Sequence, residues 1–128
     1  QRAIEHDGRD LRASVIGDRV LAAIERTAPA GDWRTNVARG GSARAFDLSP
    51  ALQQLAVRAS RAVGAEYAGV DLLVARGGGV FVLEVNGIPG WQGLQEATGI
   101  DVAGAIVDHL VARGTTRQGT VDVAGPAI

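Results

Sequence analysis

The chain has 128 residues and a net charge of −1, and 46% of its residues are hydrophobic, which is typical of one folded domain with a core. The small net charge argues against a broad nucleic-acid-binding surface, and no apolar run reaches the roughly 18–20 residues of a membrane-spanning helix. Cysteine is absent, so disulfides, thiolate metal sites and a cysteine nucleophile are excluded, and a cytoplasmic setting is the default expectation.

The basic residues narrow the chemistry further. All 13 are arginine, which excludes a P-loop lysine or a Schiff-base lysine within this chain. Histidine occurs only as His6 and His109, so a multi-histidine zinc site and a Ser-His-Asp triad are not expected. Any phosphate contact must therefore come from arginine, from backbone N–H groups or through a metal ion.

The first part of the chain predicts a hairpin. Two apolar runs, Arg9–Ile16 and residues 19–26, are separated by Gly17-Asp18, which has the length and composition of a two-residue turn. Both runs are rich in Val, Ile, Leu and Ala, so we expect the hairpin to be buried on much of both faces. A polar loop follows at residues 31–42, and a short strand is predicted at residues 43–48.

The middle of the chain predicts a helix and a second hairpin. Ser49 suits the N-cap and Pro50 the first position of a helix that Gly64 ends. Apolar residues recur at helical spacing between them. The two clearest strands of the chain follow at residues 67–75 and Val80–Asn86.

The C-terminal part predicts a loop rich in glycine and proline at residues 87–99 and a helix at about residues 101–112. Because residues 114–128 show no period, we expect one folded unit over residues 1–113 and a flexible tail over residues 114–128. The order of hairpins and helices, without regular βαβ units, predicts an α+β fold: an antiparallel sheet with helices packed on one face.

Two acidic residues of the second hairpin are predicted to face each other. If the connection takes four residues, Ala75 pairs with Val80, and Asp71 then lies directly opposite Glu84. Opposed side chains have Cβ atoms about 4.5–5.5 Å apart. Asn86 is two residues beyond Glu84 and therefore shares its face.

Opposed carboxylates repel each other unless one keeps a proton or a cation lies between them. Asp71, Glu84 and Asn86 offer only oxygen ligands from their side chains, which suits Mg²⁺ or Mn²⁺ and does not suit zinc. The alternative is that the two acids are ordinary solvent-facing strand residues. Against this alternative, both acids interrupt otherwise apolar runs.

The same residues carry a family resemblance. Several motifs, in this order along nearly the whole chain, resemble those of the RimK-type α-L-glutamate ligases of the ATP-grasp superfamily. These motifs are Gly8-Arg9-Asp10-Leu11-Arg12, Trp33-Arg34-Thr35-Asn36, Arg39-Gly40-Gly41, Gly69-Val70-Asp71, Glu84-Val85-Asn86-Gly87 and Thr98-Gly99-Ile100-Asp101. The resemblance implies that residues 1–113 form the C-terminal lobe of an ATP-grasp fold and that the cofactors are ATP and two Mg²⁺ ions, with Mn²⁺ as an option.

The resemblance also implies roles in the metal and phosphate site. Asp71 resembles the ligand of one Mg²⁺, Glu84 the ligand that bridges both ions, and Asn86 a ligand of the second ion. Arg39 resembles the catalytic arginine that contacts the nucleotide phosphates. Two glycines after it let the backbone approach the nucleotide, and these are Gly40 and Gly41.

Further positions are implied for the nucleotide and the substrate. Arg2 and Ala3 lie in the segment that resembles the hinge strand, whose backbone pairs with adenine. Asp10 matches a nucleotide-site position of the family. The implied substrate side consists of three residues, Arg12, Arg34 and Asn36, where an arginine can bind a carboxylate.

The implied activity is an ATP-dependent carboxylate–amine ligation that adds L-glutamate to an amine or carboxylate acceptor. A carboxylate would first be phosphorylated by ATP, and an amine would then attack the acylphosphate. The implied partners are ATP and an amino-acid or carboxylate substrate, with no nucleic acid and no membrane; a homo-oligomer is compatible with the family.

Two alternatives stay open at this point. One is another ATP-grasp ligase of peptide or D-alanine type, and the other is a non-catalytic metal- or nucleotide-binding domain. The lysines that the family carries on its first ATP-grasp lobe do not occur here. We therefore expect this chain to carry the Mg-ATP half-site and to be inactive alone.

Overall fold

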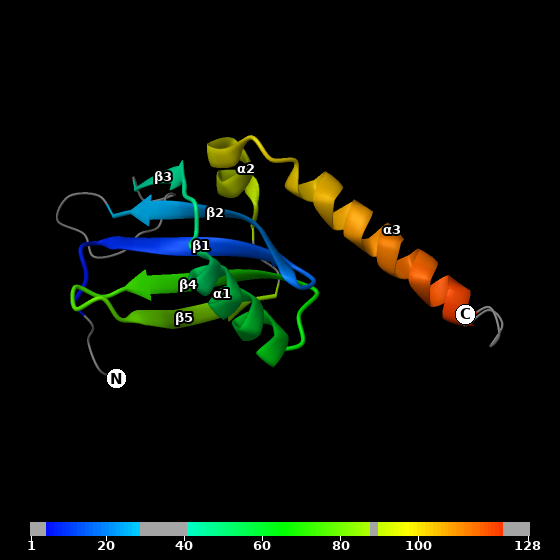
Figure 1. The fold of residues 1–128 in the computed structure, drawn as a ribbon. Helices are drawn as coiled ribbons and strands as arrows, with labels where there is room; N and C mark the ends of the chain where they lie inside the picture. Colours follow the sequence, from blue (N-terminus) through cyan, green and yellow to red (C-terminus); the bar gives the residue numbers. More distant parts are fainter. Residues whose placement is uncertain (1–4, 29–40, 88–89, 122–128) are drawn as a thin grey trace.

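A five-stranded antiparallel sheet forms the centre of the fold. The computed structural model describes residues 5–28, 41–87 and 90–121, and within them the strand order is β3-β2-β1-β4-β5 (Figure 1). The strands are β1 (Arg9–Ile16), β2 (Arg19–Thr27), β3 (Ser42–Ala45), β4 (Tyr67–Val74) and β5 (Val80–Asn86). The two predicted hairpins, β1-β2 and β4-β5, therefore lie side by side and join through β1 and β4.

Helix α1 (Pro50–Ala62) lies across one face of the sheet (Figure 1). It begins as predicted, because the Ser49 side chain accepts a hydrogen bond from the Leu52 N–H at 3.3 Å and Pro50 occupies the first turn. The apolar core beneath it comes from both hairpins and from the helix. Its buried members are Leu11, Ala13, Val15, Ala23, Leu48, Ala56, Val70 and Leu72.

The opposite face of the sheet carries a second, smaller core. Ile24 of β2 packs there with Leu94 of α2 (Gln92–Thr98) and Val102, the first residue of α3 (Val102–Val121). The predicted α+β fold with an antiparallel sheet is confirmed, but its helices divide between the two faces. The reason is that neighbouring residues of β2, Ala23 and Ile24, point to opposite faces and are both buried.

Helix α2 lies within residues 87–99, where a loop was predicted, so that prediction is wrong. The tertiary contacts of a short segment explain the helix: Leu94 is buried, and the ring of Trp91 meets Tyr67 edge-on at 6.3 Å between centroids. Gly99 ends the helix with φ 71°, a conformation that suits glycine.

Two other element boundaries differ from the prediction. Helix α3 extends to Val121 rather than to residue 112, since no proline interrupts it and a glycine inside a helix costs only about 1 kcal/mol. Strand β3 ends at Ala45 rather than at residue 48 because the chain turns there and buries Leu48 in the core beside α1.

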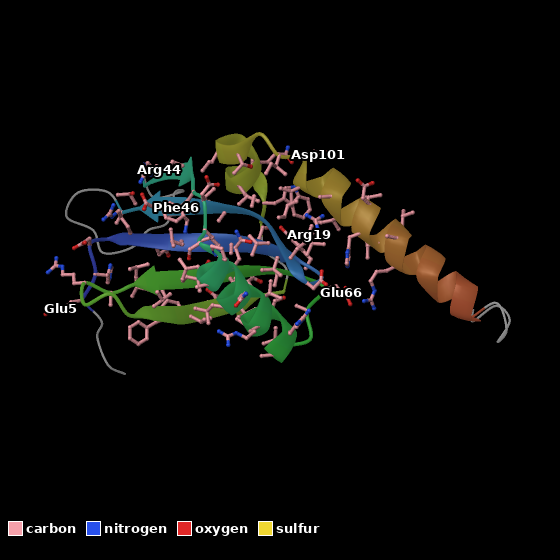
Figure 2. The ribbon with its side chains drawn as sticks, viewed as in Figure 1. Glu5, Arg19, Arg44, Phe46, Glu66 and Asp101 are labelled. Carbon is pink, nitrogen blue, oxygen red and sulfur yellow. The ribbon has the colours of Figure 1, made fainter. Side chains whose placement is uncertain are left out.

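Polar contacts at one end of the sheet hold α3. Glu66, just before β4, lies at the end of the sheet nearest to α3 (Figure 2). Its carboxylate lies 2.9 Å from His109 Nε2 and 3.2 Å from Arg113 Nη1. No helix within the described ranges is long and apolar enough to cross a membrane.

Candidate functional site

Asp71 and Glu84 are directly opposite each other in the β4-β5 pair, so the predicted register is confirmed at this position. The pairing between the turn and Asp71 differs from the prediction, because Val74 rather than Ala75 pairs with Val80. A bulge between Asp71 and Leu72 then adds one residue on β5 and restores the predicted pairing.

The turn of this hairpin is correspondingly longer than four residues. The Ala75 N–H donates to the Gly79 carbonyl at 2.8 Å, so Ala75 belongs to the connection and not to the strand. Gly78 has φ 89°, a conformation that L-residues rarely adopt. Asn86 pairs with Gly69, and it therefore shares the sheet face of Glu84 as predicted.

The Asp71 carboxylate is held by Arg12. Arg12 and Asp71 are partners in the β1-β4 pair. Arg12 Nε donates to Asp71 Oδ1 at 2.7 Å, and Arg12 Nη2 donates to Asp71 Oδ2 at 2.9 Å. The Asp71 side chain is only 9% exposed, so this is a fork-to-fork contact at a largely desolvated position.

A second arginine, Arg26, joins the same group. It pairs with Asp10 across β1 and β2 and donates from Nε to Oδ1 at 2.8 Å and from Nη2 to Oδ2 at 2.6 Å. Arg26 Nη2 also lies 3.3 Å from Asp71 Oδ2. We call Asp10, Arg12, Arg26 and Asp71 the ion quartet; its four formal charges cancel.

Arg26 stays fully charged in the ion quartet. Burial acts to lower the pKa of its guanidinium, but the hydrogen bond to Asp10 and the negative charges of Asp71 and Asp10 outweigh burial and raise the pKa. Arg26 is therefore a permanent positive charge between the two aspartates.

Arg26 is not among the site residues predicted from the sequence. Counting back from the Gly17-Asp18 turn without interruption would place Asp10 opposite Glu25. A bulge between Ser14 and Val15 moves the register by one residue, so that Asp10 meets Arg26 instead. The sequence signal that could have indicated Arg26 is its charge inside an apolar strand, at the end of β2 far from the Gly17-Asp18 turn.

Glu84 offers a carboxylate without an ion pair in the described part of the chain. It is exposed on β5, and it faces the same side of the sheet as Asp71. Asp71, Glu84 and Asn86 thus present carboxylate and amide oxygens from two adjacent strands, which is the ligand chemistry of a hard divalent cation. The described residues contain no group of three or more His, Cys, Asp and Glu side chains that could hold a metal ion, so an ion at Asp71, Glu84 and Asn86 would need further ligands such as water or phosphate oxygens.

Several predicted site residues lie outside the described residues. These are Arg2, Ala3, Arg34, Asn36, Arg39 and Gly40. Gly41 is described and directly precedes β3. Because Ala43 of β3 pairs with Arg26, the start of β3 lies beside the Asp10–Arg26 end of the ion quartet.

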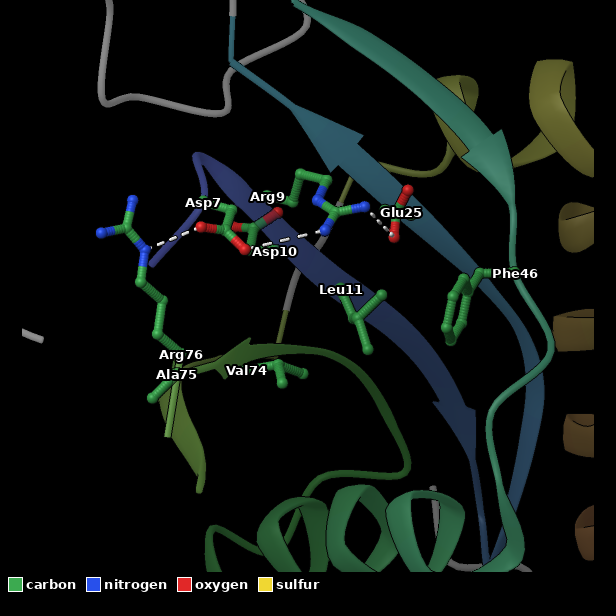
Figure 3. A pocket seen from close by; sticks show the side chains of 9 residues that line it. All are labelled: Asp7, Arg9, Asp10, Leu11, Glu25, Phe46, Val74, Ala75 and Arg76. Carbon is green, nitrogen blue, oxygen red and sulfur yellow. Dashed lines mark hydrogen bonds and ion pairs between the residues drawn. The ribbon is translucent and has the colours of Figure 1, made fainter. Parts of the chain in front are cut away.

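A separate hollow of about 290 Å³ lies near the start of β1, and Figure 3 shows its lining. Leu11, Phe46 and Val74 supply its apolar wall. Asp7 receives a hydrogen bond from Arg76, which together with the charges of Arg76 and Arg9 lowers the pKa of Asp7 despite some desolvation. The charged side chains around the hollow form ion pairs with one another or with flanking arginines, so their charges are already balanced without a charged ligand.

Comparisons with known proteins agree on one family. The family model described as the RimK-like ATP-grasp domain matches residues 1–110. A protein of Haemophilus ducreyi named probable alpha-L-glutamate ligase is 50% identical over 109 residues, which cover 85% of this chain and 35% of that protein. The chain thus spans about a third of the length of this relative.

Solved structures give the same fold. The ATP-grasp ligase PsnB, in a complex with a phosphomimetic variant of its minimal precursor, Mg and ADP, superposes with a TM-score of 0.69 at 28% identity and covers 85% of this chain and 33% of its own. The D-alanine–D-alanine ligase of Bacillus anthracis, complexed with ATP, superposes with a TM-score of 0.61 at 20% identity, over 89% of this chain and 40% of its own.

Proposed function

Because the chain belongs to the RimK-like ATP-grasp domain family, we propose that it is the part of an ATP-dependent carboxylate–amine ligase that holds Mg²⁺ and the nucleotide phosphates. The observation that carries the proposal is the pairing of Asp71 with Glu84, with Asn86 two residues further along the same face. This arrangement gathers oxygen ligands on one side of a rigid hairpin, where they can face the phosphates of a bound nucleotide.

The roles proposed for the residues are those that the resemblance to the family implies. Asp71 would bind one Mg²⁺, Glu84 would bridge two ions, and Asn86 would bind the second. Magnesium bound there offsets the negative charge of the phosphates and of the group in transfer. Arg39, with Gly40 and Gly41, would contact the phosphates, and Asp10 holds Arg26 beside the start of β3.

The proposed reaction is the addition of L-glutamate through an acylphosphate. Its support is the name of the relative from Haemophilus ducreyi and the chemistry available in this chain. The chain has no cysteine or lysine that could act as a covalent nucleophile, and phosphoryl transfer to a carboxylate needs none, because positioning and charge neutralisation are the main demands. The remaining substrate positions proposed are Arg12, Arg34 and Asn36, with Arg2 and Ala3 at the adenine.

A ligase of D-alanine or peptide type is the second candidate. Two likenesses favour it. The Bacillus anthracis ligase shares the fold at 20% identity, and PsnB, whose structure contains a precursor, shares it at the higher identity of 28%. Measuring ADP release by the full-length protein with L-glutamate, D-alanine and short peptides as separate substrates discriminates the two. L-glutamate-dependent ADP release is expected, and release that depends only on D-alanine or peptide would favour the second candidate.

The metal assignment is tested by Glu84→Gln in the full-length protein. The change keeps the size of the side chain and removes the charge, so Mg-ATP turnover should fall by about 100-fold or more while the thermal unfolding midpoint stays near that of the parent. Glu96→Gln is the matched control, because Glu96 is an exposed acid of α2 whose side chain contacts Gln92. Near-normal turnover in Glu84→Gln would contradict the assignment.

A further inference from the structure

Both oxygens of the Asp71 carboxylate are already occupied in this structure. Oδ1 accepts from Arg12 Nε at 2.7 Å, and Oδ2 accepts from Arg12 Nη2 at 2.9 Å and lies 3.3 Å from Arg26 Nη2. A divalent cation at Asp71 would share the carboxylate with one or two guanidinium groups and would be repelled by their charge. Release of an arginine from this carboxylate would therefore favour metal binding.

The two arginines differ in what holds them. Arg26 is anchored by both oxygens of Asp10, at 2.6 and 2.8 Å, and its contact to Asp71 is the longest of the group. Arg12 makes its side-chain hydrogen bonds within the described residues to Asp71 alone. Its side chain is also more exposed, at 22% against 14% for Arg26. Arg12 can therefore leave without breaking any other described contact, whereas Arg26 cannot.

We propose that Arg12 is an exchangeable counter-cation for Asp71. This inference rests on the proposed function and adds a step to it. Before the metal and nucleotide arrive, Arg12 neutralises Asp71 and holds its carboxylate toward β1, on the side of β4 away from β5. When the cation binds, Arg12 releases Asp71 and its guanidinium becomes available to an anionic oxygen of the phosphate or substrate.

Arg26 is a positioning residue in the same exchange. Because it remains bound to Asp10 and reaches only Oδ2, it can hold Asp71 in place after Arg12 has left. Oδ1 receives its only described hydrogen bond from Arg12, so the departure of Arg12 frees this oxygen completely. The geometry points to Asp71 Oδ1 as the atom that receives the cation.

The exchange predicts a larger effect of Arg12 than of Arg26 on metal affinity. The measurement is the binding of Mn²⁺ alone, without nucleotide, to the full-length protein, followed by electron paramagnetic resonance of the free ion. Arg12→Met removes the competing charge and should tighten Mn²⁺ binding by about tenfold or more. Arg26→Met removes a charge that opposes the cation but also the anchor of Asp71; the two effects offset each other, so binding should change less than in Arg12→Met. Arg44→Met is the matched control, because Arg44 pairs with the buried Glu25 on the opposite face, and it should leave binding unchanged.

A second measurement on the unsubstituted protein does not depend on whether the variants fold. In ¹⁵N spectra of the arginine Nε–H groups, addition of Mg²⁺ and a non-hydrolysable ATP analogue should shift the signal of Arg12 strongly and leave that of Arg26 in place. Signals are assigned by Arg12→Lys and Arg26→Lys. An Arg12 signal that stays unchanged at saturating ligand would overturn the exchange.

The outcomes separate the exchange from the proposed function. If the unsubstituted protein binds Mn²⁺ and Arg12→Met binds it equally well or more weakly, the exchange is wrong and the metal site stands. If neither the unsubstituted protein nor Arg12→Met binds Mn²⁺, even with the ATP analogue, the proposed function fails and the exchange fails with it.

Discussion

Asp71 of β4 and Glu84 of β5 face each other although the hairpin that carries them changes register between its turn and this pair. The longer turn and the bulge compensate for each other, and the pairing at Asp71 is the one that an uninterrupted four-residue connection would give. Opposed carboxylates destabilise a strand pair when nothing neutralises them. In this structure Arg12 and Arg26 supply positive charge at Asp71, which neutralises one of the two opposed carboxylates.

The Asp10–Arg26 pair should contribute strongly to stability. Asp10 is 6% exposed, and Asp10→Ala would leave a buried guanidinium whose one remaining ion pair among the described residues is the longer contact to Asp71. We expect a loss of about 3 kcal/mol in the free energy of unfolding, measured by urea denaturation of the chain. Asp7→Ala, which breaks the exposed pair with Arg76, is the control and should leave the midpoint almost unchanged. Equal losses in the two variants would contradict the importance of burial.

The core beneath α1 predicts that two leucines of the β4-β5 hairpin differ in how much they contribute to stability. Leu72 is fully buried, whereas Leu83, at the bulge, is 52% exposed. Leu72→Ala should lower the free energy of unfolding by about 3 kcal/mol, because it removes buried methyl groups and leaves a cavity. Leu83→Ala should change it by less than about 1 kcal/mol. A loss at Leu83 as large as that at Leu72 would show that the exposed edge of β5 is packed in solution.

Gly17 couples the first hairpin to α3. Its φ is 59°, and a Cβ at this position would lie 2.7 Å from His109 Cε1. Gly17→Ala should therefore lower the free energy of unfolding by about 2–3 kcal/mol, from backbone strain and from overpacking together.

Two variants separate the contributions at Gly17. Gly64 has φ 70°, and a Cβ added to it would meet no atom within 4 Å, so Gly64→Ala should show the backbone strain alone, about 1 kcal/mol. Gly17→Ala in a His109→Ala background should lose only about as much as Gly64→Ala. If the loss at Gly17 is the same with and without the His109 ring, the contact with α3 does not contribute.

The sequence predicted best where local signals and burial agree. The strands Arg9–Ile16 and Val80–Asn86 have the predicted bounds, and Ser49-Pro50 begins α1 as expected. In these segments the hydrophobic pattern, the turn residues and the capping residues all favour the same structure. The pairing of Asp71 with Glu84 could be counted from the turn only because two irregularities cancel.

Features set by tertiary contacts could not be predicted in this way. Helix α2 depends on the burial of Leu94 and on the contact between Trp91 and Tyr67, residues distant in sequence. The ion pair of Arg26 with Asp10 depends on a bulge that no turn signal marks. A proton or a metal ion was predicted to relieve the repulsion between the opposed acids, and in the structure arginines from β1 and β2 neutralise Asp71 instead.

The most direct test of the metal site is the structure of the full-length protein crystallised with Mn²⁺ and a non-hydrolysable ATP analogue, with the ion located by its anomalous scattering. The account predicts a Mn²⁺ ion within coordination distance of Asp71 Oδ1 and the Glu84 carboxylate, with Arg12 turned away from Asp71 and Arg26 still on Asp10. A Mn²⁺ ion bound to the phosphates but away from Asp71 and Glu84, with Arg12 still holding both oxygens of Asp71, would contradict it.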